Sequence, residues 1–222
     1  MATPRSAALV TPATGPSPAA ATLVLAHGAG APMDSPFMTA MAERIASYGI
    51  TVHRFEFAFM AARRTGGKRP APKAERLCGE YRAIVPEAAR GGRLFIGGKS
   101  LGGRVASMVA DALYADGRIA GLVCLGYPFH PPKKPQILRT AHLATLTCPT
   151  LIVQGTADPL GDRKDVEGYS LSPSIALHWI EAADHDLMPR TGARGTARTA
   201  AREAALDDAA TAIQAFVIRA GG

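Results

Sequence analysis

A serine inside a glycine-rich turn is the strongest chemical signal in this chain. The segment Gly98-Lys99-Ser100-Leu101-Gly102 fits the pattern G-x-S-x-G, between an apolar run at 93–96 and a helix-period stretch at 105–113. A sharp turn from strand to helix lifts such a serine hydroxyl above the sheet, and glycines tolerate the backbone angles that this turn needs. We therefore predict that Ser100 is a nucleophile. The alternative is that it only caps the helix.

A serine nucleophile needs a base and an orienting acid, and both follow expected strands. Asp158 comes shortly after the apolar run 151–153, and His185 comes after a strand that ends at Ile180. Imidazole, with an unperturbed pKa of about 6.5, can take up and return a proton. A carboxylate would hold the ring in the right tautomer. We predict His185 as the base and Asp158 as the acid, with kcat/KM falling below about pH 6.5.

Each of these two assignments has an alternative. Asp158 precedes a proline, a pair that commonly marks a turn, and Asp162 or Asp165 could replace it as the acid. His185 could be an ordinary loop histidine. Its competitors are His27, His130, His142 and His178, of which we expect His27 to be structural.

The residues around Ser100 and His185 invite two further interpretations. Gly98-Lys99-Ser100 resembles the end of the phosphate-binding pattern G-x-x-x-x-G-K-[ST], but that pattern needs glycine at position 93, which is Arg93. Nucleotide hydrolysis is therefore disfavoured. We expect Lys99 to point away from the site as a charge on the helix side. Asp184 and Asp186 flank His185 and are expected to be solvated, although they could orient its loop.

Short strands alternate with helical patterns along the chain. The expected strands are 22–26, 50–55, 93–96, 119–125, 150–153 and 175–180, and the expected helices are 36–48, 74–89, 105–113 and 196–218. Residues 57–73 are expected to form a basic loop, and Pro86 puts the last turn of the second helix in doubt. This alternation predicts an α/β fold with a mostly parallel sheet and helices on both faces. Residues 1–20 are expected to be a flexible arm, with a short strand at 7–10 as an option, before a single domain at 21–222.

Length and composition exclude several classes of protein. The chain has 222 residues, of which 47% are hydrophobic, so it can bury a sizeable core. No apolar stretch approaches the roughly 20 residues of a membrane helix, and we expect no secretory signal and no membrane association. Cys78, Cys124 and Cys148 have no metal or disulfide spacing. We expect buried thiols, no metal or cofactor, and a cytoplasmic location, with an organelle transit peptide as the alternative.

The net charge of +7 has two main local sources, the stretches 57–73 and 127–141. Such charge can attract nucleic acid or acidic ligands, but the signatures of the common nucleic-acid-binding modules are missing, so we expect no nucleic acid. The bland alternative is a solvated surface. The residues that could contact a small anionic substrate are Arg63, Arg64, Tyr127, Phe129 and Lys133. Phe57, Phe59 and Met60 could line an acyl pocket, and core packing suits them and the two other aromatic residues equally well.

Four segments follow expected strands, at 27–30, 98–102, 154–159 and 183–186, and in this order they resemble the α/β-hydrolase superfamily over roughly residues 20–220. The strings His27-Gly28-Ala29-Gly30-Ala31 and 126–132 are similar to a small, nearly lidless, dienelactone-hydrolase-like branch that includes testis-expressed-type homologues. The resemblance implies a serine hydrolase of a small carboxylic ester or thioester, with the backbone N–H groups of Ala29 and Leu101 as oxyanion donors. Dienelactone hydrolases proper use a cysteine where this chain has Ser100.

Two features limit this resemblance. Only about two dozen residues separate the strand that ends near Gly126 from the one that begins at Thr150, so a large lid domain has no room there. A fold alone does not confer an activity. The alternative function is therefore a non-catalytic interaction module that keeps the fold and uses the basic loops as its binding face, although a complete set of triad candidates favours an enzyme. The sequence assigns no oligomeric state.

Overall fold

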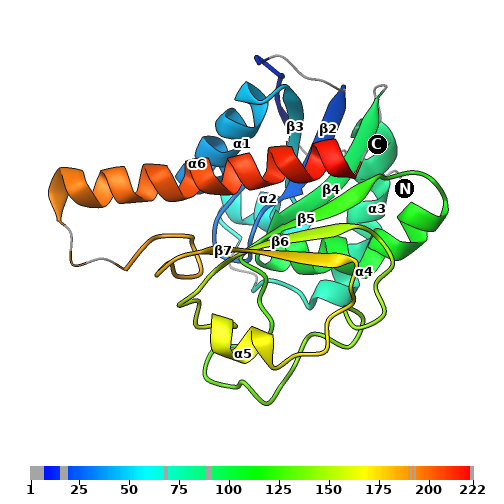
Figure 1. Ribbon diagram of the computed structural model, residues 1–222. Coiled ribbons are helices and arrows are strands. Elements are labelled where there is room, and N and C mark those ends of the chain that lie inside the picture. Colours follow the sequence, from blue (N-terminus) through cyan, green and yellow to red (C-terminus); the bar gives the residue numbers. More distant parts are fainter. Residues whose placement is uncertain are drawn as a thin grey trace.

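One sheet forms the centre of the protein. The structure is a computed structural model that describes residues 8–15, 20–67, 70–88, 92–190, 192 and 194–220. The strand order is β1-β3-β2-β4-β5-β6-β7 (Figure 1). The strands are β1 (Ala8–Thr11), β2 (Ala21–Ala26), β3 (Ile50–Phe55), β4 (Arg93–Lys99), β5 (Gly121–Leu125), β6 (Thr150–Gly155) and β7 (Ile175–Ile180). β1 is antiparallel to β3 and the other neighbours are parallel, which confirms the predicted mostly parallel sheet.

Helices cover both faces of the sheet. α1 (Pro36–Ser47) and α6 (Gly195–Arg219) pack on one face, and α3 (Cys78–Ala88) and α4 (Leu101–Ala115) on the other (Figure 1). Alternate residues of a strand point to opposite faces. Leu23 and Leu25 of β2 accordingly belong to the core under α1 and α6, and Val24 and Ala26 to the core under α3 and α4. The prediction of helices on both faces is confirmed.

The ends of α1 follow the predicted signals. Ser35 is the N-cap and its hydroxyl accepts a hydrogen bond from the N–H of Met38 at 3.5 Å, with Pro36 at the first helical position. α6 buries the predicted residues Leu206, Ala209, Ile213 and Phe216. Arg44 of α1 ties the two helices together because its guanidinium pairs with Glu203 and, at 2.6 Å, with Asp207.

The prediction of a loop over 57–73 is wrong for its first half. Residues Ala58–Arg64 form the helix α2. Its first N–H, that of Ala58, donates to Glu80 of α3 at 2.8 Å, and Phe59 and Met60 are buried. These tertiary contacts stabilise a helix that is too short to be stable alone. Residues 68 and 69 lie outside the described residues.

The helix expected at 74–89 is two elements. A 3₁₀ helix, η1 (Ala74–Leu77), leads directly into α3. α3 continues through Pro86 to Ala88, and Ile84, Val85 and Ala88 stay in the core. Packing therefore outweighs the hydrogen-bond donor that proline removes at this position.

Two further segments are the edge strand β1 and the long connection between β5 and β6. Residues 8–11, within the stretch expected to be an arm, form β1 against β3, with Ala8 opposite Phe55. Residues 126–149 join β5 to β6 and contain no helix, which agrees with the prediction that no large lid is present. α5 (Arg163–Glu167) follows β6. Among the described helices, none is both long and apolar enough to cross a membrane.

Candidate active site

The turn between β4 and α4 holds Ser100 in a strained backbone conformation. Its φ is 51° and its ψ is −113°, a region that L-residues rarely occupy. The turn requires glycine at two positions. A Cβ on Gly102 would lie only 2.5 Å from the carbonyl oxygen of Ala26, and a Cβ on Gly98 only 2.4 Å from the carbonyl carbon of Gly102. The Ser100 side chain makes no capping hydrogen bond. A capping role therefore does not explain this serine.

Ser100, His185 and Asp158 meet at the carboxyl ends of β4, β7 and β6. The Oγ of Ser100 lies 2.8 Å from Nε2 of His185, and Nδ1 of His185 lies 2.7 Å from Oδ2 of Asp158. Asp158 is fully buried. The structure thus brings together the three residues that the sequence singled out. Their geometry lets a hydroxyl pass its proton to an imidazole whose other nitrogen is held by a carboxylate.

Gln154 fixes the carboxylate of Asp158, and sequence reasoning did not identify it. Its Nε2 donates to Oδ2 of Asp158 at 2.8 Å, while the N–H of Leu160 donates to Oδ1 at 2.8 Å. Gln154 is fully buried and its Oε1 accepts the N–H of Tyr127 at 2.7 Å. A buried amide needs partners, so a glutamine within the apolar strand β6 was the available signal.

The alternative acids and two of the alternative histidines lie away from Ser100. Asp162 caps α5 by accepting the N–H of Asp165 at 2.8 Å. Asp165 contacts His130, with 3.3 Å between Oδ2 and Nε2. His142 contacts Ser107 on α4 at 2.8 Å. These residues form local contacts away from Ser100.

His27 and Arg63 hold the turn that follows β2. The imidazole of His27 donates from Nδ1 to the carbonyl of Gly28 at 2.6 Å and accepts the N–H of Phe57 at Nε2, 3.1 Å away. Burial lowers the pKa of His27, which favours the neutral ring that this pattern requires. Arg63 donates to the carbonyl oxygen of Ala29 at 2.8 Å. Ala29, the candidate oxyanion donor, is thus fixed from two sides.

Lys99 points into the site, and the prediction that it points away is wrong. Its side chain is 8% exposed, and its Nζ donates to the carbonyl oxygen of His185 at 2.8 Å and lies 3.2 Å from Asp186. Burial lowers the pKa of Lys99, and Asp186 partly offsets this. The carboxylate of Asp184 accepts two backbone N–H groups of its own loop. The segment that carries His185 is therefore held by lysine and aspartate side chains.

The predicted substrate-contact residues occupy different places. Arg64 pairs with Glu56 at 2.7 Å and with Asp34 at 2.6 Å. Lys133 is exposed and belongs to neither of the cavities beside Ser100. Tyr127 and Phe129 are fully buried in the core. Phe57, Phe59 and Met60 are core residues as well.

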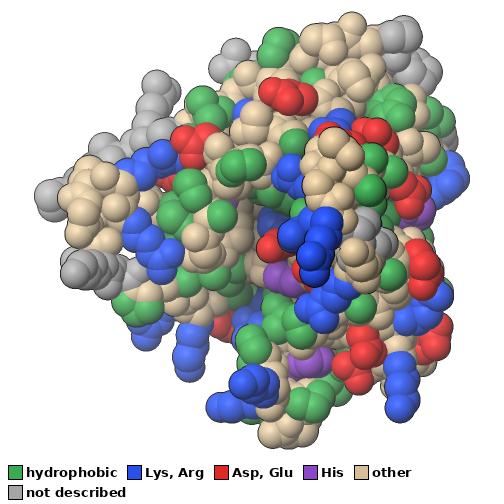
Figure 2. All heavy atoms as spheres, turned by 90° about the vertical axis from the view of Figure 1, so that its left-hand side faces the viewer, with side chains coloured by type: hydrophobic (Ala, Val, Ile, Leu, Met, Phe, Trp, Pro, Cys, Tyr) green, Lys and Arg blue, Asp and Glu red, His purple; other side chains and the backbone are tan. Residues whose placement is uncertain are grey.

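Two cavities border Ser100. One, of about 310 Å³, includes Lys99, His185 and Phe37, and the other, of about 370 Å³, includes Leu101 and is not lined by His185. Both also include Ala29 and Ser100. Figure 2 looks onto the side where α6 begins, and Lys and Arg side chains lie on both sides of a central hollow.

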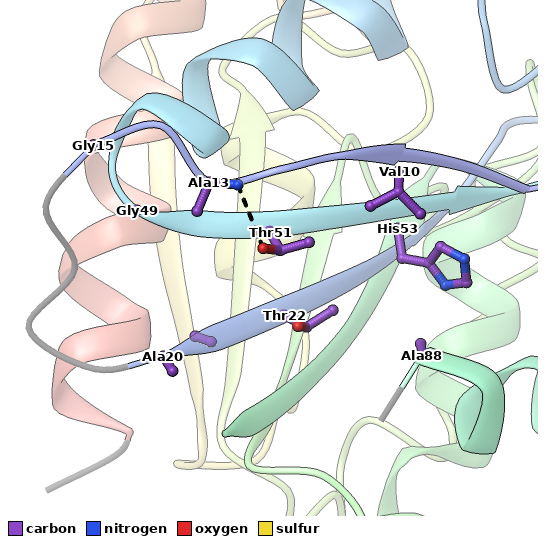
Figure 3. A pocket seen from close by; sticks show the side chains of 10 residues that line it. Val10, Ala13, Gly15, Ala20, Thr22, Gly49, Thr51, His53 and Ala88 are labelled. Carbon is purple, nitrogen blue, oxygen red and sulfur yellow. Dashed lines mark hydrogen bonds between the residues drawn. The ribbon is translucent and has the colours of Figure 1, made fainter. Parts of the chain in front are cut away.

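A third cavity, of about 400 Å³, lies at the opposite end of the sheet, where β2 and β3 begin. Figure 3 shows His53 and Thr22 at its edge, and the hydroxyl oxygen of Thr51 accepts a hydrogen bond from the N–H of Ala13. In open α/β sheets, ligands bind at the carboxyl ends of the strands. The candidate site is therefore the one around Ser100.

The match to a protein family identifies a hydrolase, which implies a small-molecule substrate. The family model described as an alpha/beta hydrolase domain matches residues 19–218. The chain therefore belongs to the alpha/beta hydrolase family.

Solved structures agree on the fold. A serine hydrolase without a lid from Xanthomonas campestris is 20% identical with a TM-score of 0.66, covering 99% of this chain and 96% of that one. A serine hydrolase homologue from Coxiella burnetii is 19% identical with a TM-score of 0.62, covering 90% and 89%. Est1E from Butyrivibrio proteoclasticus is 13% identical with a TM-score of 0.68, covering 96% and 93%. The family match confirms the predicted superfamily, and the shared fold agrees with the prediction of no large lid.

Proposed function

We propose that this protein is a serine hydrolase that cleaves a small carboxylic ester or thioester through Ser100, His185 and Asp158. The observation that carries the proposal is the unbroken chain of hydrogen bonds from the Ser100 hydroxyl through His185 to the buried Asp158. A serine hydroxyl is a weak nucleophile at neutral pH, and a contacting imidazole activates it. Cavities of about 310 and 370 Å³ on the two sides of Ser100 suit a small substrate.

The proposed reaction has two acyl-transfer steps. Ser100 Oγ forms a bond to the carbonyl carbon as its proton moves to Nε2 of His185. The C–O or C–S bond to the leaving group then breaks, and His185 gives that group the proton. A water molecule then attacks the carbonyl carbon of the acyl-enzyme while Nε2 of His185 takes its proton. The bond from that carbon to Ser100 Oγ breaks, the acid leaves, and His185 returns the proton to Ser100. Asp158 keeps the proton of neutral His185 on Nδ1 and stabilises the imidazolium.

The oxyanion that forms in each step needs hydrogen-bond donors. The backbone N–H groups of Ala29 and Leu101 are our candidates because both residues line the cavity beside Ser100. Leu101 begins α4, so its N–H belongs to the unsatisfied, positive end of a helix. Losing one such donor typically costs about 3 kcal/mol of transition-state stabilisation.

We also propose that the protein is located in a reducing compartment such as the cytoplasm. This proposal rests on the free thiols of Cys78, Cys124 and Cys148, which are typical of proteins kept under reducing conditions.

A fluorophosphonate probe tests the proposal. We expect covalent labelling of the wild type, loss of labelling in Ser100→Ala, and at least about a 10³-fold loss of ester hydrolysis in that variant. Ser107→Ala is the matched control, because Ser107 also contacts a histidine, at 2.8 Å, but belongs to no triad. A folded wild type that takes no label would contradict the hydrolase and favour an interaction module that uses its basic loops to bind a partner.

A further inference from the structure

The cavity beside Ser100 that His185 does not line has two arginines in its wall that the proposed reaction does not use. Ala29, Ser100 and Leu101 line it together with Arg104 and Arg139. The proposed nucleophile and both candidate oxyanion donors therefore share the lining of one cavity of about 370 Å³ with two arginines.

Arg139 is fixed by its backbone and left without an acidic partner. Its N–H donates to the carbonyl of Phe129 at 2.8 Å, and its own carbonyl accepts the hydroxyl of Tyr127 at 3.0 Å. Within the described residues, its guanidinium forms no ion pair. Burial and the neighbouring Arg104 both lower the pKa of Arg139. A bound anion would relieve this unfavourable electrostatic environment.

Arg104 is only partly satisfied. It follows Ser100 by one helical turn on α4, and its Nη2 donates to Glu75 at 2.7 Å. Its Nε is buried and has no hydrogen-bond partner in the part of the chain that the structure describes. Lys73 also lines the cavity. With Glu75 as the acidic partner of Arg104, the cations around this cavity outnumber the carboxylates.

The position of His185 decides which half of a substrate occupies this cavity. The leaving group must receive its proton from Nε2 of His185, so it departs on the side where His185 lines the cavity of about 310 Å³. In the proposed reaction the acyl group, which stays bound to Ser100, would then occupy the cavity that His185 does not line. Arg104 and Arg139 line that cavity.

We infer that the acyl group of the substrate ends in a carboxylate that binds Arg104 and Arg139. This inference rests on the proposed hydrolase function and defines its substrates as hemi-esters or hemi-thioesters of small dicarboxylic acids. The planar guanidinium fork matches a carboxylate and can bind both of its oxygens. The sequence suggested Arg63, Arg64 and Lys133 as contacts for an anionic substrate, and this inference gives that role to Arg104 and Arg139.

Matched substrates test the inference by kinetics. The 4-nitrophenyl esters of glutaric acid and of pentanoic acid have the same acyl chain length and differ in the terminal carboxylate. We expect the wild type to favour the glutarate hemi-ester by about tenfold or more in kcat/KM, and Arg104→Gln or Arg139→Gln to lower this ratio about tenfold. The ratio between the two esters is the readout, because a general loss of activity lowers kcat/KM for both esters alike. Lys134→Gln is the control, because Lys134 is exposed on the same connection and lies outside the cavity.

A ratio of one or less in the wild type, or a ratio that neither arginine variant changes, would overturn the inference. A binding measurement decides the matter without turnover. Monomethyl glutarate should bind Ser100→Ala saturably by calorimetry, and adding Arg139→Gln should abolish this. Absence of binding would overturn the inference even in an active esterase. If the wild type took no fluorophosphonate label and Ser100→Ala still bound monomethyl glutarate, the proposed hydrolase function would be refuted and the carboxylate site would stand.

Discussion

The two sides of Ser100 use their polar groups in opposite ways. On the side of His185, both ring nitrogens and both oxygens of Asp158 have hydrogen-bond partners inside the chain. On the other side, Nε of Arg104 lacks a hydrogen-bond partner and the Arg139 guanidinium lacks an ion pair within the described residues.

This difference separates two tasks. Groups that move protons must be in place before the substrate arrives, because preorganised dipoles cost nothing to reorient during the reaction. Groups that select a substrate are most discriminating when a missing ligand atom leaves them unpaired. The Asp158 network meets the first condition and the arginine cavity the second.

Asp158→Asn is the largest test of the preorganised side. The amide group would oppose the donors of Gln154 and His185, which now meet the Oδ2 of the carboxylate at 2.8 and 2.7 Å. The wrong tautomer of His185 would result, and we expect kcat to fall by about 10⁴-fold on glutarate and pentanoate esters alike. Steady-state kinetics on both esters measures this.

Asp162→Asn is the control for that loss. Asp162 caps α5 and its carboxylate accepts the N–H of Asp165, a role that asparagine also fills. We expect kcat within about twofold of wild type, as for a surface change away from the site. A similar large loss in both variants would mean that the segment after β6 is unfolding, and that Asp158 has no special part in orienting His185.

Lys99→Met probes a smaller effect on the same side. Methionine keeps the length of the buried side chain but removes the hydrogen bond from Nζ to the carbonyl of His185. We expect kcat to fall about tenfold with KM within about twofold, because a slight displacement of the base weakens the transition state more than binding. Because burial lowers the pKa of Lys99, removing its charge should leave the melting temperature unchanged or raise it.

Asp186→Asn is the matched variant for Lys99. The Asp186 side chain is 76% exposed, and exposed ion pairs contribute at most about 1 kcal/mol. Little change in kcat is expected. If Lys99→Met lowered kcat only in proportion to a lowered melting temperature, its effect would be on folding, and Lys99 would not be a positioning residue for His185.

The sequence predicted the residues that the proposed chemistry needs and missed most of those that hold them. Ser100, Asp158 and His185 follow apolar runs within about five residues and in a fixed order, and parallel strands bring their carboxyl ends to one edge. Gln154 and Lys99 also follow apolar runs, but the sequence does not show which groups the fold brings opposite their side chains. The contact from Lys99 to His185, for example, joins residues far apart in the sequence.

The substrate-contact residues illustrate the same limit. Arg63 and Arg64 are adjacent in a basic stretch, and that proximity suggested a charged rim. In the fold Arg63 holds the carbonyl of Ala29 and Arg64 neutralises the buried Glu56. Arg104 and Arg139 lie far apart in the sequence, and α4 and the β5–β6 connection bring them to one cavity. Local charge density does not distinguish paired arginines from those left for a ligand.

His27 gives the smallest expected effect, on stability at acidic pH. Burial lowers its pKa below the ordinary 6.5, and protonation would place a hydrogen on the Nε2 that accepts the N–H of Phe57. The unfolded chain therefore binds the proton first, and stability falls as pH drops below about 6.5 towards the folded pKa, by up to about 1.4 kcal/mol per pH unit. His27→Gln should be less stable than wild type at pH 7.5, and urea denaturation should show this difference narrowing at pH 5. His142, whose pKa burial also lowers, contributes equally to both proteins and cancels. A difference that stays constant with pH would mean that folding does not hold His27 neutral in the turn that follows β2.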